Sequence, residues 1–304
     1  MIHMKTSRTA YLPLFLIAFL VFQLISGAAS AYQETGKTII TWTVKDDKDN
    51  LLPYVSVGIV DEESGTVTNE QGKFILQLKP ENKQGIIRFS CIGHETMELK
   101  VTEAISRFSK QKTLAIILKV KQKEIKEVKV DARRWITSVK GGKVGPEASF
   151  HQAFMRTPGR LEEHLGREVA LLIHNRRKQA FLKKLNFCIN ANRYSDVKFR
   201  VNIYSVDNGR PHENILKENI YLEVPDKKTG WIEVDLEPYN IYLEDDFVVS
   251  LEWIDCYPKP KNVMYLTLSG GFGGHTVFQK KASQAKWEKF PGAIGMNVTL
   301  QHEK

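Results

Sequence analysis

The chain has 304 residues, of which 42% are hydrophobic and 10% aromatic, and its 44 Lys and Arg residues against 35 Asp and Glu residues give a formal charge of +9. This composition excludes a disordered low-complexity chain and a collagen-like chain, because it provides enough apolar surface to offset the entropy lost on folding. Three cysteines are too few for a disulfide scaffold, and the length suggests about two domains.

The N-terminus has the features of a secretory signal peptide. Lys5 and Arg8 precede an uncharged apolar run from Ala10 to Ile25, which is shorter than the ~20 residues that span a bilayer. Small residues then lead up to Ala31, so we expect a signal peptide at 1–31; the alternative is an uncleaved N-terminal anchor. No second apolar run is long enough to cross a membrane. We therefore expect an exported protein without a transmembrane segment after cleavage, periplasmic or associated with the outer membrane or cell surface.

The segment 32–132 is predicted to be an all-β domain. It consists of short β-rich runs separated by turn signals, with one helical turn expected at 104–109. Strands at this spacing are typical of an antiparallel sandwich. The expected strands are 38–44, 54–60, 73–78, 86–92, 96–101, 113–119 and 125–130.

Three motifs occur in order in this segment: DNLLPYVSV at 49–57, GTVTNEQGKF at 65–74 and FSCIGHE at 89–95. They resemble the carboxypeptidase-regulatory-like domain of Bacteroidetes surface and envelope proteins, whose pattern runs roughly G-x-PLPGVSV, GT-x-TDE-x-GxF and FSYIGY. Tyr54 stands where that family usually has Gly, and His94 where it usually has an aromatic residue. The resemblance implies a seven-stranded transthyretin-like sandwich without catalytic residues. Phe74 and Phe89 are expected in its core.

The same module precedes the plug and barrel of TonB-dependent receptors, and KEIKEVKV at 123–130 resembles its end in those receptors. Too few residues follow for such a barrel, so we do not expect a complete receptor. The segment 133–160 is predicted to be a linker, because it contains KGGKVGP at 140–146 and lacks periodicity. A short helix is a candidate at 160–165.

The segment 161–304 is predicted to be a jelly-roll-like β sandwich of eight to ten strands. Its clearest strand is 197–204, where polar and apolar residues alternate for eight residues. The runs at 199–204, 230–236 and 249–253 look like the C-terminal module of secreted Bacteroidetes proteins with this two-domain plan. No activity follows from that looser resemblance. Trp231 and Trp253 lie on alternating strands and are expected in the core.

No catalytic motif is recognisable, so we do not expect an enzyme. The eight histidines show neither H-x-H nor HExxH spacing, and no G-x-S-x-G elbow occurs. SGGFGGH at 269–275 lacks the Lys-Ser/Thr ending of a phosphate loop, and we expect a flexible loop there; the alternative is a mobile lid beside a ligand groove.

Two further groups of residues leave alternatives open. Glu244, Asp245 and Asp246 form either a solvated turn or a calcium site, since clustered carboxylates suit a hard cation; no other cofactor is expected. Cys188 and Cys256 either pair across the second sandwich or stay free.

Carbohydrate binding is the functional interpretation of a jelly roll, because sugars stack on exposed aromatic rings while polar side chains bind their hydroxyls. The candidate ligand-binding residues lie in loops and late strands, and they are Tyr257, Tyr265, Phe272 and Trp287.

Three functions stay open. We favour a non-catalytic exported envelope protein that acts as an interaction or ligand-binding module, with an envelope protein or a polysaccharide as its partner. The second is a carbohydrate-binding accessory protein of a glycan-uptake system. The third is a hydrolase with a site assembled from distant residues, which would require a cleft holding a carboxylate pair or a His–carboxylate pair. Export and the lack of a recognition motif argue against a nucleic-acid partner.

Overall fold

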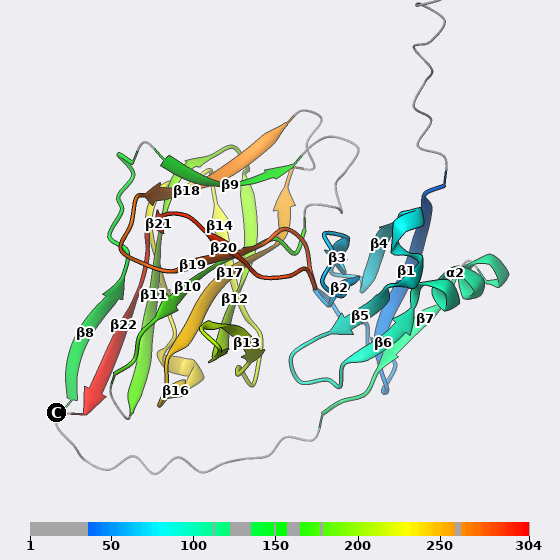
Figure 1. Cartoon of the computed structure of the whole chain (residues 1–304), viewed down its shortest axis with the longest axis horizontal. Coiled ribbons are helices and arrows are strands. Elements are labelled where there is room, and N and C mark those ends of the chain that lie inside the picture. The colour runs from blue at the N-terminus through cyan, green and yellow to red at the C-terminus, as the bar shows by residue number, and fades with distance from the viewer. Residues whose placement is uncertain are drawn as a thin grey trace, which may run out of the picture. The chain divides into compact units, whose positions relative to one another are not determined.

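The computed structural model describes residues 36–111, 113–121, 135–148, 150–156, 165–176, 179–258 and 263–303 (Figure 1). The predicted signal peptide, the strand expected at 125–130 and nearly all of the helix candidate at 160–165 lie outside these residues. The described chain is almost entirely β, as predicted. Within it, no helix is both long enough and apolar enough to span a membrane.

The first sandwich has seven described strands in two sheets. Six of them overlap predicted strands, whereas β3 was not predicted. One sheet has the order β4-β1-β7 and the other the order β3-β2-β5-β6. β1 and β7 pair in parallel, whereas we expected antiparallel pairing throughout. The strands are β1 (Thr38–Asp46), β2 (Ser56–Ile59), β3 (Gly65–Val67), β4 (Lys73–Leu78), β5 (Ile86–Ser90), β6 (Met97–Lys100) and β7 (Ala115–Leu118).

The core of this sandwich lies between its two sheets. Alternation along β4 buries Phe74 and exposes Lys73, as a half-buried strand requires. The rings of Phe74 and Phe89 are almost completely buried, and their centroids lie 5.7 Å apart in an edge-to-face arrangement. The prediction of these two residues as core is therefore confirmed.

Two helical segments flank these strands. The 3-10 helix η1 (Pro80–Gln84) precedes β5, and the α-helix α2 (Val101–Lys110) follows β6. We predicted only a single turn at 104–109. Apolar residues recur at helical spacing along α2, at Val101, Ala104, Ile105 and Phe108, and they pack in or against the first core. The sequence therefore contained the signal for the longer helix, and the prediction was too short.

The second sandwich consists of a seven-stranded and an eight-stranded sheet. The first has the path β13-β12-β17-β10-β19-β20, with β14 paired to β12; the second has the path β21-β18-β11-β22-β8, with β15 and β16 paired to β11 and β9 to β18. The strands are β8 (Trp135–Gly141), β9 (Phe150–Arg156), β10 (Glu168–Ile173), β11 (Ala180–Asn192), β12 (Asp196–Asp207), β13 (Arg210–Asn214), β14 (Ile220–Pro225), β15 (Gly230–Asp235), β16 (Tyr242–Leu243), β17 (Phe247–Tyr257), β18 (Met264–Gly271), β19 (Val277–Lys280), β20 (Glu288–Phe290), β21 (Ala293–Ile294) and β22 (Met296–Glu303), with the 3-10 helix η3 (Glu237–Tyr239) after β15. Several of these strands have only two to four residues, too few to show a periodicity, which is why eight to ten were predicted.

The prediction of a linker at 133–160 is wrong for its described part, because this segment contributes β8 and β9. β8 lies beside β22 at an edge of its sheet, and β9 pairs with β18 (Figure 1). The side chains of β8 are half-buried or exposed, so they do not alternate in hydrophobicity. A Cβ added to Gly142 would lie 2.0 Å from the carbonyl oxygen of Ile294. Gly142 therefore permits close packing rather than flexibility.

The aromatic core of this sandwich contains Trp253, Phe199 and Phe187, all fully buried. Trp253 is core as predicted, but the same prediction for Trp231 is wrong, because this side chain is 42% exposed. Alternation along β15 places Trp231 on the outer face with Glu233, while Ile232 points inward. The cysteines of the described chain form no disulfide, and the buried Cys188 and Cys256 lie in different sheets.

The strand β12 shows the predicted alternation with one unexpected property. Phe199, Val201 and Ile203 point into the core of the sandwich. On the opposite face, Arg200 and Asn202 are also buried, with exposed fractions of 3% and 2%. The polar face of β12 is therefore covered by other parts of the chain, and this covered face is the basis of the candidate site.

Candidate functional site

A row of four charged side chains crosses the outer face of the seven-stranded sheet. Arg200 of β12 pairs in register with Glu252 of β17, Glu252 with Glu168 of β10, and Glu168 with Lys280 of β19. Side chains at paired positions of neighbouring strands point to the same face of a sheet. The strand register thus places two carboxylates between two cations.

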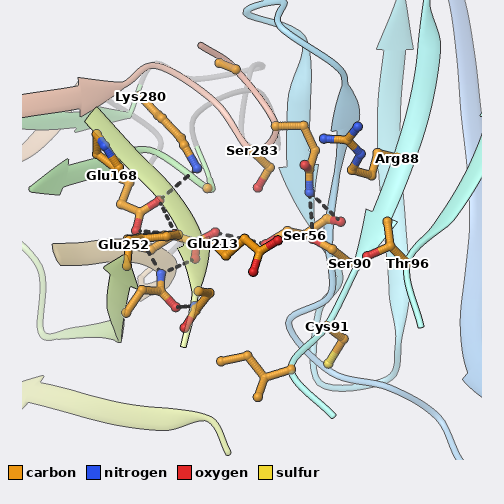
Figure 2. Close-up of a pocket in the computed structure, with 18 of the residues that line it drawn as sticks. Ser56, Arg88, Ser90, Cys91, Thr96, Glu168, Glu213, Glu252, Lys280 and Ser283 are labelled. Carbon is orange, nitrogen blue, oxygen red and sulfur yellow. Dashed lines mark hydrogen bonds and ion pairs between the residues drawn. The ribbon is translucent and has the colours of Figure 1, made fainter. Parts of the chain in front are cut away.

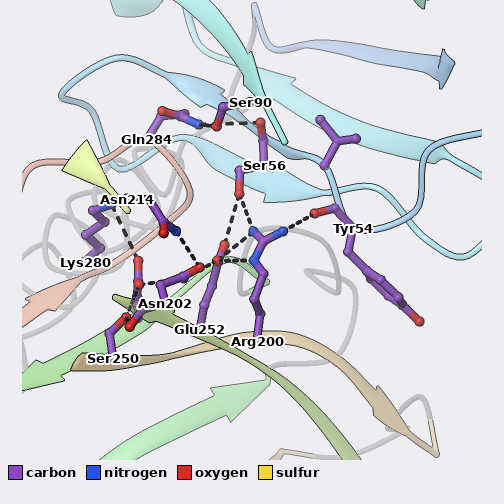
Figure 3. Close-up of polar contacts among 12 residues, drawn as sticks. Tyr54, Ser56, Ser90, Arg200, Asn202, Asn214, Ser250, Glu252, Lys280 and Gln284 are labelled. Atoms are coloured by element: carbon purple, nitrogen blue, oxygen red, sulfur yellow. Dashed lines mark hydrogen bonds and ion pairs between the residues drawn. The ribbon is translucent and has the colours of Figure 1, made fainter. Parts of the chain in front are cut away.

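The guanidinium of Arg200 makes four hydrogen bonds (Figure 3). Its Nε and Nη2 donate to Oε2 of Glu252 at 2.9 and 2.7 Å. Its Nη1 donates to the carbonyl oxygen of Tyr54 at 2.7 Å, and Nη2 also donates to Oγ of Ser56 at 2.6 Å. Because Tyr54 and Ser56 belong to the first sandwich, this single side chain joins the two sandwiches.

Glu168 is the second buried carboxylate, with an exposed fraction of 2%. Its Oε1 accepts hydrogen bonds from Nδ2 of Asn202 and from the hydroxyl of Tyr204, each at 2.9 Å, and from the hydroxyl of Ser250. Asn202 Nδ2 also donates to Glu252 Oε2 at 3.1 Å. The two carboxylates are therefore linked through one amide group, and the whole floor is a continuous hydrogen-bond network.

Lys280 connects this floor to an aromatic wall. Its Nζ lies 3.5 Å from Oε2 of Glu168, 4.2 Å from the ring centroid of Trp287 and 5.3 Å from that of Tyr204. The rings of Tyr204 and Trp287 meet edge to face, with centroids 5.5 Å apart. These contacts fix Lys280 by both charge and cation–π attraction.

The segment 281–287, between β19 and β20, also contacts the first sandwich. We call it the clasp. Lys281 Nζ lies 2.6 Å from Oε1 of Glu63, and Gln284 Nε2 donates to Oγ of Ser90 at 2.8 Å. The carbonyl oxygen of Gln284 accepts a bond from the backbone amide of Asp61 at 2.9 Å.

Glycines of the first sandwich allow this clasp to approach closely. A Cβ added to Gly58 or to Gly65 would lie 2.2 Å from the carbonyl oxygen of Ser283. Real Cβ atoms do not approach an oxygen so closely, so each position requires glycine for steric reasons.

Between the two sandwiches lies a cleft of about 870 Å³, with the charged row at its floor (Figure 2). Its opposite wall is formed by residues of the first sandwich, including Arg88, Ser90 and Cys91. Trp287 lies in the wall that the clasp provides. Six basic and five acidic side chains line the cleft, so its net charge is close to zero.

Burial changes the proton affinity of three groups in this cleft. Burial, followed by the charge of Glu168, raises the pKa of Tyr204 well above its ordinary value, so its hydroxyl stays a donor. Burial opposes the charge of Arg200, but the charge and hydrogen bonds of Glu252 outweigh it and raise the pKa of Arg200. Burial raises the pKa of Cys91, which makes this thiol a poor nucleophile.

Of the four predicted ligand-binding residues, the structure places only Trp287 in this cleft. Tyr257 is 65% exposed at the end of β17, where it pairs with Asp196. The ring of Tyr265 packs under the guanidinium of Arg193, and Phe272 is 89% exposed just after β18. The first three residues of the loop predicted at 269–275 belong to β18.

The carboxylates predicted as a calcium site lie between β16 and β17. Both oxygens of Asp246 accept hydrogen bonds, from Nδ1 of His174 at 2.6 Å and from the backbone amide of Asn175 at 2.7 Å. In the described part of the chain, no group of three His, Cys, Asp or Glu side chains could hold a metal ion. Calcium binding by Glu244, Asp245 and Asp246 stays a prediction.

Glu168, Arg200 and Glu252 were missed by the sequence analysis. Arg200 and Glu252 occupy polar positions of alternating strands, which normally indicates exposure to water, and Glu168 begins an otherwise apolar strand. The available signal was that large charged residues recur at these positions in three strands. Strand pairing cannot be read from the sequence, so nothing showed that the three residues are neighbours.

Comparison with known proteins supports the assignment of the first sandwich. Residues 40–130 match the family model of the CarboxypepD_reg-like domain. This segment is a carboxypeptidase-regulatory-like domain. The regulatory-like domain thus supplies Ser56 and Ser90 to the cleft, and the carbonyl oxygen of Tyr54 holds the floor residue Arg200. No curated protein matches the chain.

Among the solved structures with weak similarity to the chain are a bacterial and a viral protein. One contains the cysteine protease and lectin-like domains of Cwp84, a surface layer associated protein of Clostridium difficile, with 13% identity and a TM-score of 0.35 over 50% of this chain and 36% of that one. The other is the infectious bursal disease virus VP2 subviral particle, with 7% identity and a TM-score of 0.25 over 88% of this chain and 64% of that one. The chain spans less than two thirds of the length of either structure.

Proposed function

We propose that the protein is a non-catalytic binding module of the exported envelope class, which holds a polar ligand of low net charge in the cleft between its two sandwiches. The observation that carries this proposal is the cleft of about 870 Å³ with its hydrogen-bonded floor and with Trp287 in its wall. A cavity of this size with converging polar groups is a typical small-ligand site. The near balance of charge in its lining favours a neutral ligand over a polyanion.

Carbohydrate is the ligand class that fits these features best. A sugar offers hydroxyls to the polar side chains of the floor and wall, and an apolar face to an indole ring. The floor groups are held by each other before a ligand arrives, so little ordering is needed on binding. This proposal combines the favoured binding role with its carbohydrate alternative.

A glycan array of neutral oligosaccharides, followed by calorimetry on the strongest ligand, tests the proposal. We expect Trp287→Ala to weaken binding at least ~10-fold, the loss typical of a central aromatic contact. Tyr257→Ala is the matched control, because Tyr257 lies outside the cleft. Loss of binding only in Tyr257→Ala would place the site elsewhere on the second sandwich, and no binding to any glycan would contradict the carbohydrate assignment.

A hydrolase is the second candidate, because the cleft holds the carboxylate pair that this function would require. Glu168 and Glu252 occupy paired positions on neighbouring strands. Glycosidases use such pairs, with one carboxyl group as the proton donor. Here each carboxylate is almost fully buried and ion-paired with a neighbouring cation, an arrangement typical of a structural role. We therefore rank hydrolysis below binding.

Chromogenic glycosides separate these two functions. If the protein hydrolyses them, Glu168→Gln and Glu252→Gln should each abolish turnover while glycan binding persists. Absence of turnover by the wild-type protein on substrates that it binds would exclude glycoside hydrolysis.

A further inference from the structure

Tyr54 differs from its neighbours in both backbone and side chain. Its φ is +56°, a conformation that glycine adopts readily and that is rare for an aromatic residue. The resembling family usually has glycine at this position. The backbone of the regulatory-like domain alone therefore favours glycine here, and the presence of tyrosine requires another explanation.

The side chain of Tyr54 supplies that explanation. Although Tyr54 belongs to the regulatory-like domain, its buried ring is part of the hydrophobic cluster of the second sandwich. The ring meets that of Tyr221 edge to face, with centroids 5.3 Å apart. Nζ of Lys198 lies 5.1 Å from the centroid of the Tyr54 ring.

The polar atoms of Tyr54 also contact the second sandwich. Its hydroxyl accepts a hydrogen bond from Nζ of Lys198 at 3.0 Å and donates to Oε1 of Glu70 at 3.0 Å. Its carbonyl oxygen accepts the bond from Arg200 at 2.7 Å (Figure 3). Two of these three polar contacts, with Lys198 and Arg200, reach the second sandwich, and the third, with Glu70, stays within the regulatory-like domain.

We propose that Tyr54 is the positioning residue that docks the regulatory-like domain onto the second sandwich and so forms the cleft. The strained backbone holds the carbonyl toward Arg200 and the ring toward Tyr221. The interface stabilises a conformation that the isolated domain disfavours. This proposal does not depend on the ligand or on whether the cleft is catalytic, because it concerns only how the two walls are joined.

Substitution of Tyr54 by glycine separates docking from folding. Tyr54→Gly keeps a residue that suits φ +56° but removes the ring and the hydroxyl. Tyr54→Phe keeps the ring and loses only the hydroxyl. Asp49→Gly is the matched control, since Asp49 also has a positive φ, of +68°, in an exposed turn of the same domain.

The readouts are calorimetry and hydrogen exchange on the full-length chain. We expect one transition for the wild-type, Tyr54→Phe and Asp49→Gly proteins, and two for Tyr54→Gly. Exchange in Tyr54→Gly should accelerate for the amides of β12 and β17, whose outer face loses its cover, while the strands of the regulatory-like domain keep their protection. A single transition in Tyr54→Gly, or loss of protection inside its regulatory-like domain, would overturn the proposal.

Discussion

Replacing Arg200 by methionine should strongly destabilise the folded protein. Arg200 and Glu252 are almost fully buried, with side-chain exposures of 4% and 5%, and their closest atoms are 2.7 Å apart. The substitution leaves the charge of Glu252 buried without its cation and removes the donors to Tyr54 and Ser56. Removing one partner of a buried ion pair costs about 3–5 kcal/mol. For a domain of this size, that corresponds to a fall in Tm on the order of 10 °C.

Lys184→Met provides the control for this experiment. Lys184 pairs with Glu233 at 2.8 Å, a similar distance, but the two side chains are 37% and 55% exposed. Exposed pairs contribute only about 0–1 kcal/mol, because water and salt screen them. Both variants are compared with the wild type by urea unfolding at constant pH, which gives the free energy of unfolding directly.

A double-mutant cycle then isolates the pair itself. Once Arg200 is gone, Glu252 is already uncompensated, so adding Glu252→Gln should cost far less than it does alone. We expect the double variant to differ from the sum of the two single variants by more than ~1 kcal/mol, as is usual for residues in direct contact. If Arg200→Met lowers the free energy of unfolding no more than Lys184→Met does, the interface is hydrated and the reasoning is wrong.

Two more predictions concern the clasp and the alkaline pH range. Gly65→Ala should destabilise the protein by about 1–3 kcal/mol, the usual cost of overpacking, because the new Cβ would meet the Ser283 carbonyl; Gly145→Ala, with open space around it, should be neutral in the same urea assay. Equal effects of the two substitutions on the free energy of unfolding would contradict this prediction and show that the clasp moves to make room for the added methyl group. Burial raises the pKa of Tyr54 from 10.0 to about 12, so the unfolded chain loses this proton first as the pH rises. The stability that depends on protonated Tyr54 is complete below pH 10 and is lost between pH 10 and about 12. Tyr54→Phe should remove this part of the alkaline loss of stability, and an unchanged pH profile would contradict the assignment.

The sequence predicted what depends on local patterns. Alternation in β12 and the motifs around Phe74 and Phe89 predicted strands, faces and a family, because each signal lies within a few neighbouring residues. The edge strand β8 was not predicted, because its side chains face water on both sides and it therefore has no hydrophobic period. Gly142 was taken as a sign of flexibility, although it serves close packing against Ile294.

The candidate site was less accessible to sequence analysis for a different physical reason. Glu168 and Glu252 are neighbours only because β10 and β17 pair, and nothing in either strand encodes that pairing. Trp287 was proposed because aromatic residues in loops are frequent ligand contacts, but the same reasoning chose Tyr257 and Phe272, which lie outside the cleft. Tyr54 was noticed as a departure from a family pattern, but its role required the position of Arg200.

The clasp also determines when the fold can be completed. It bonds residues that are far apart in the chain: Lys281 and Glu63 are 218 positions apart, and Gln284 and Ser90 are 194 apart. During synthesis the regulatory-like domain emerges first, and its docking face stays uncovered until almost the last strand has been made. Contacts of such high sequence separation form slowly, because a long loop must close before they contribute. In the interval, Tyr54 exposes an aromatic ring and Ser56 lacks its partners, so the half-made chain presents a surface that the complete fold covers.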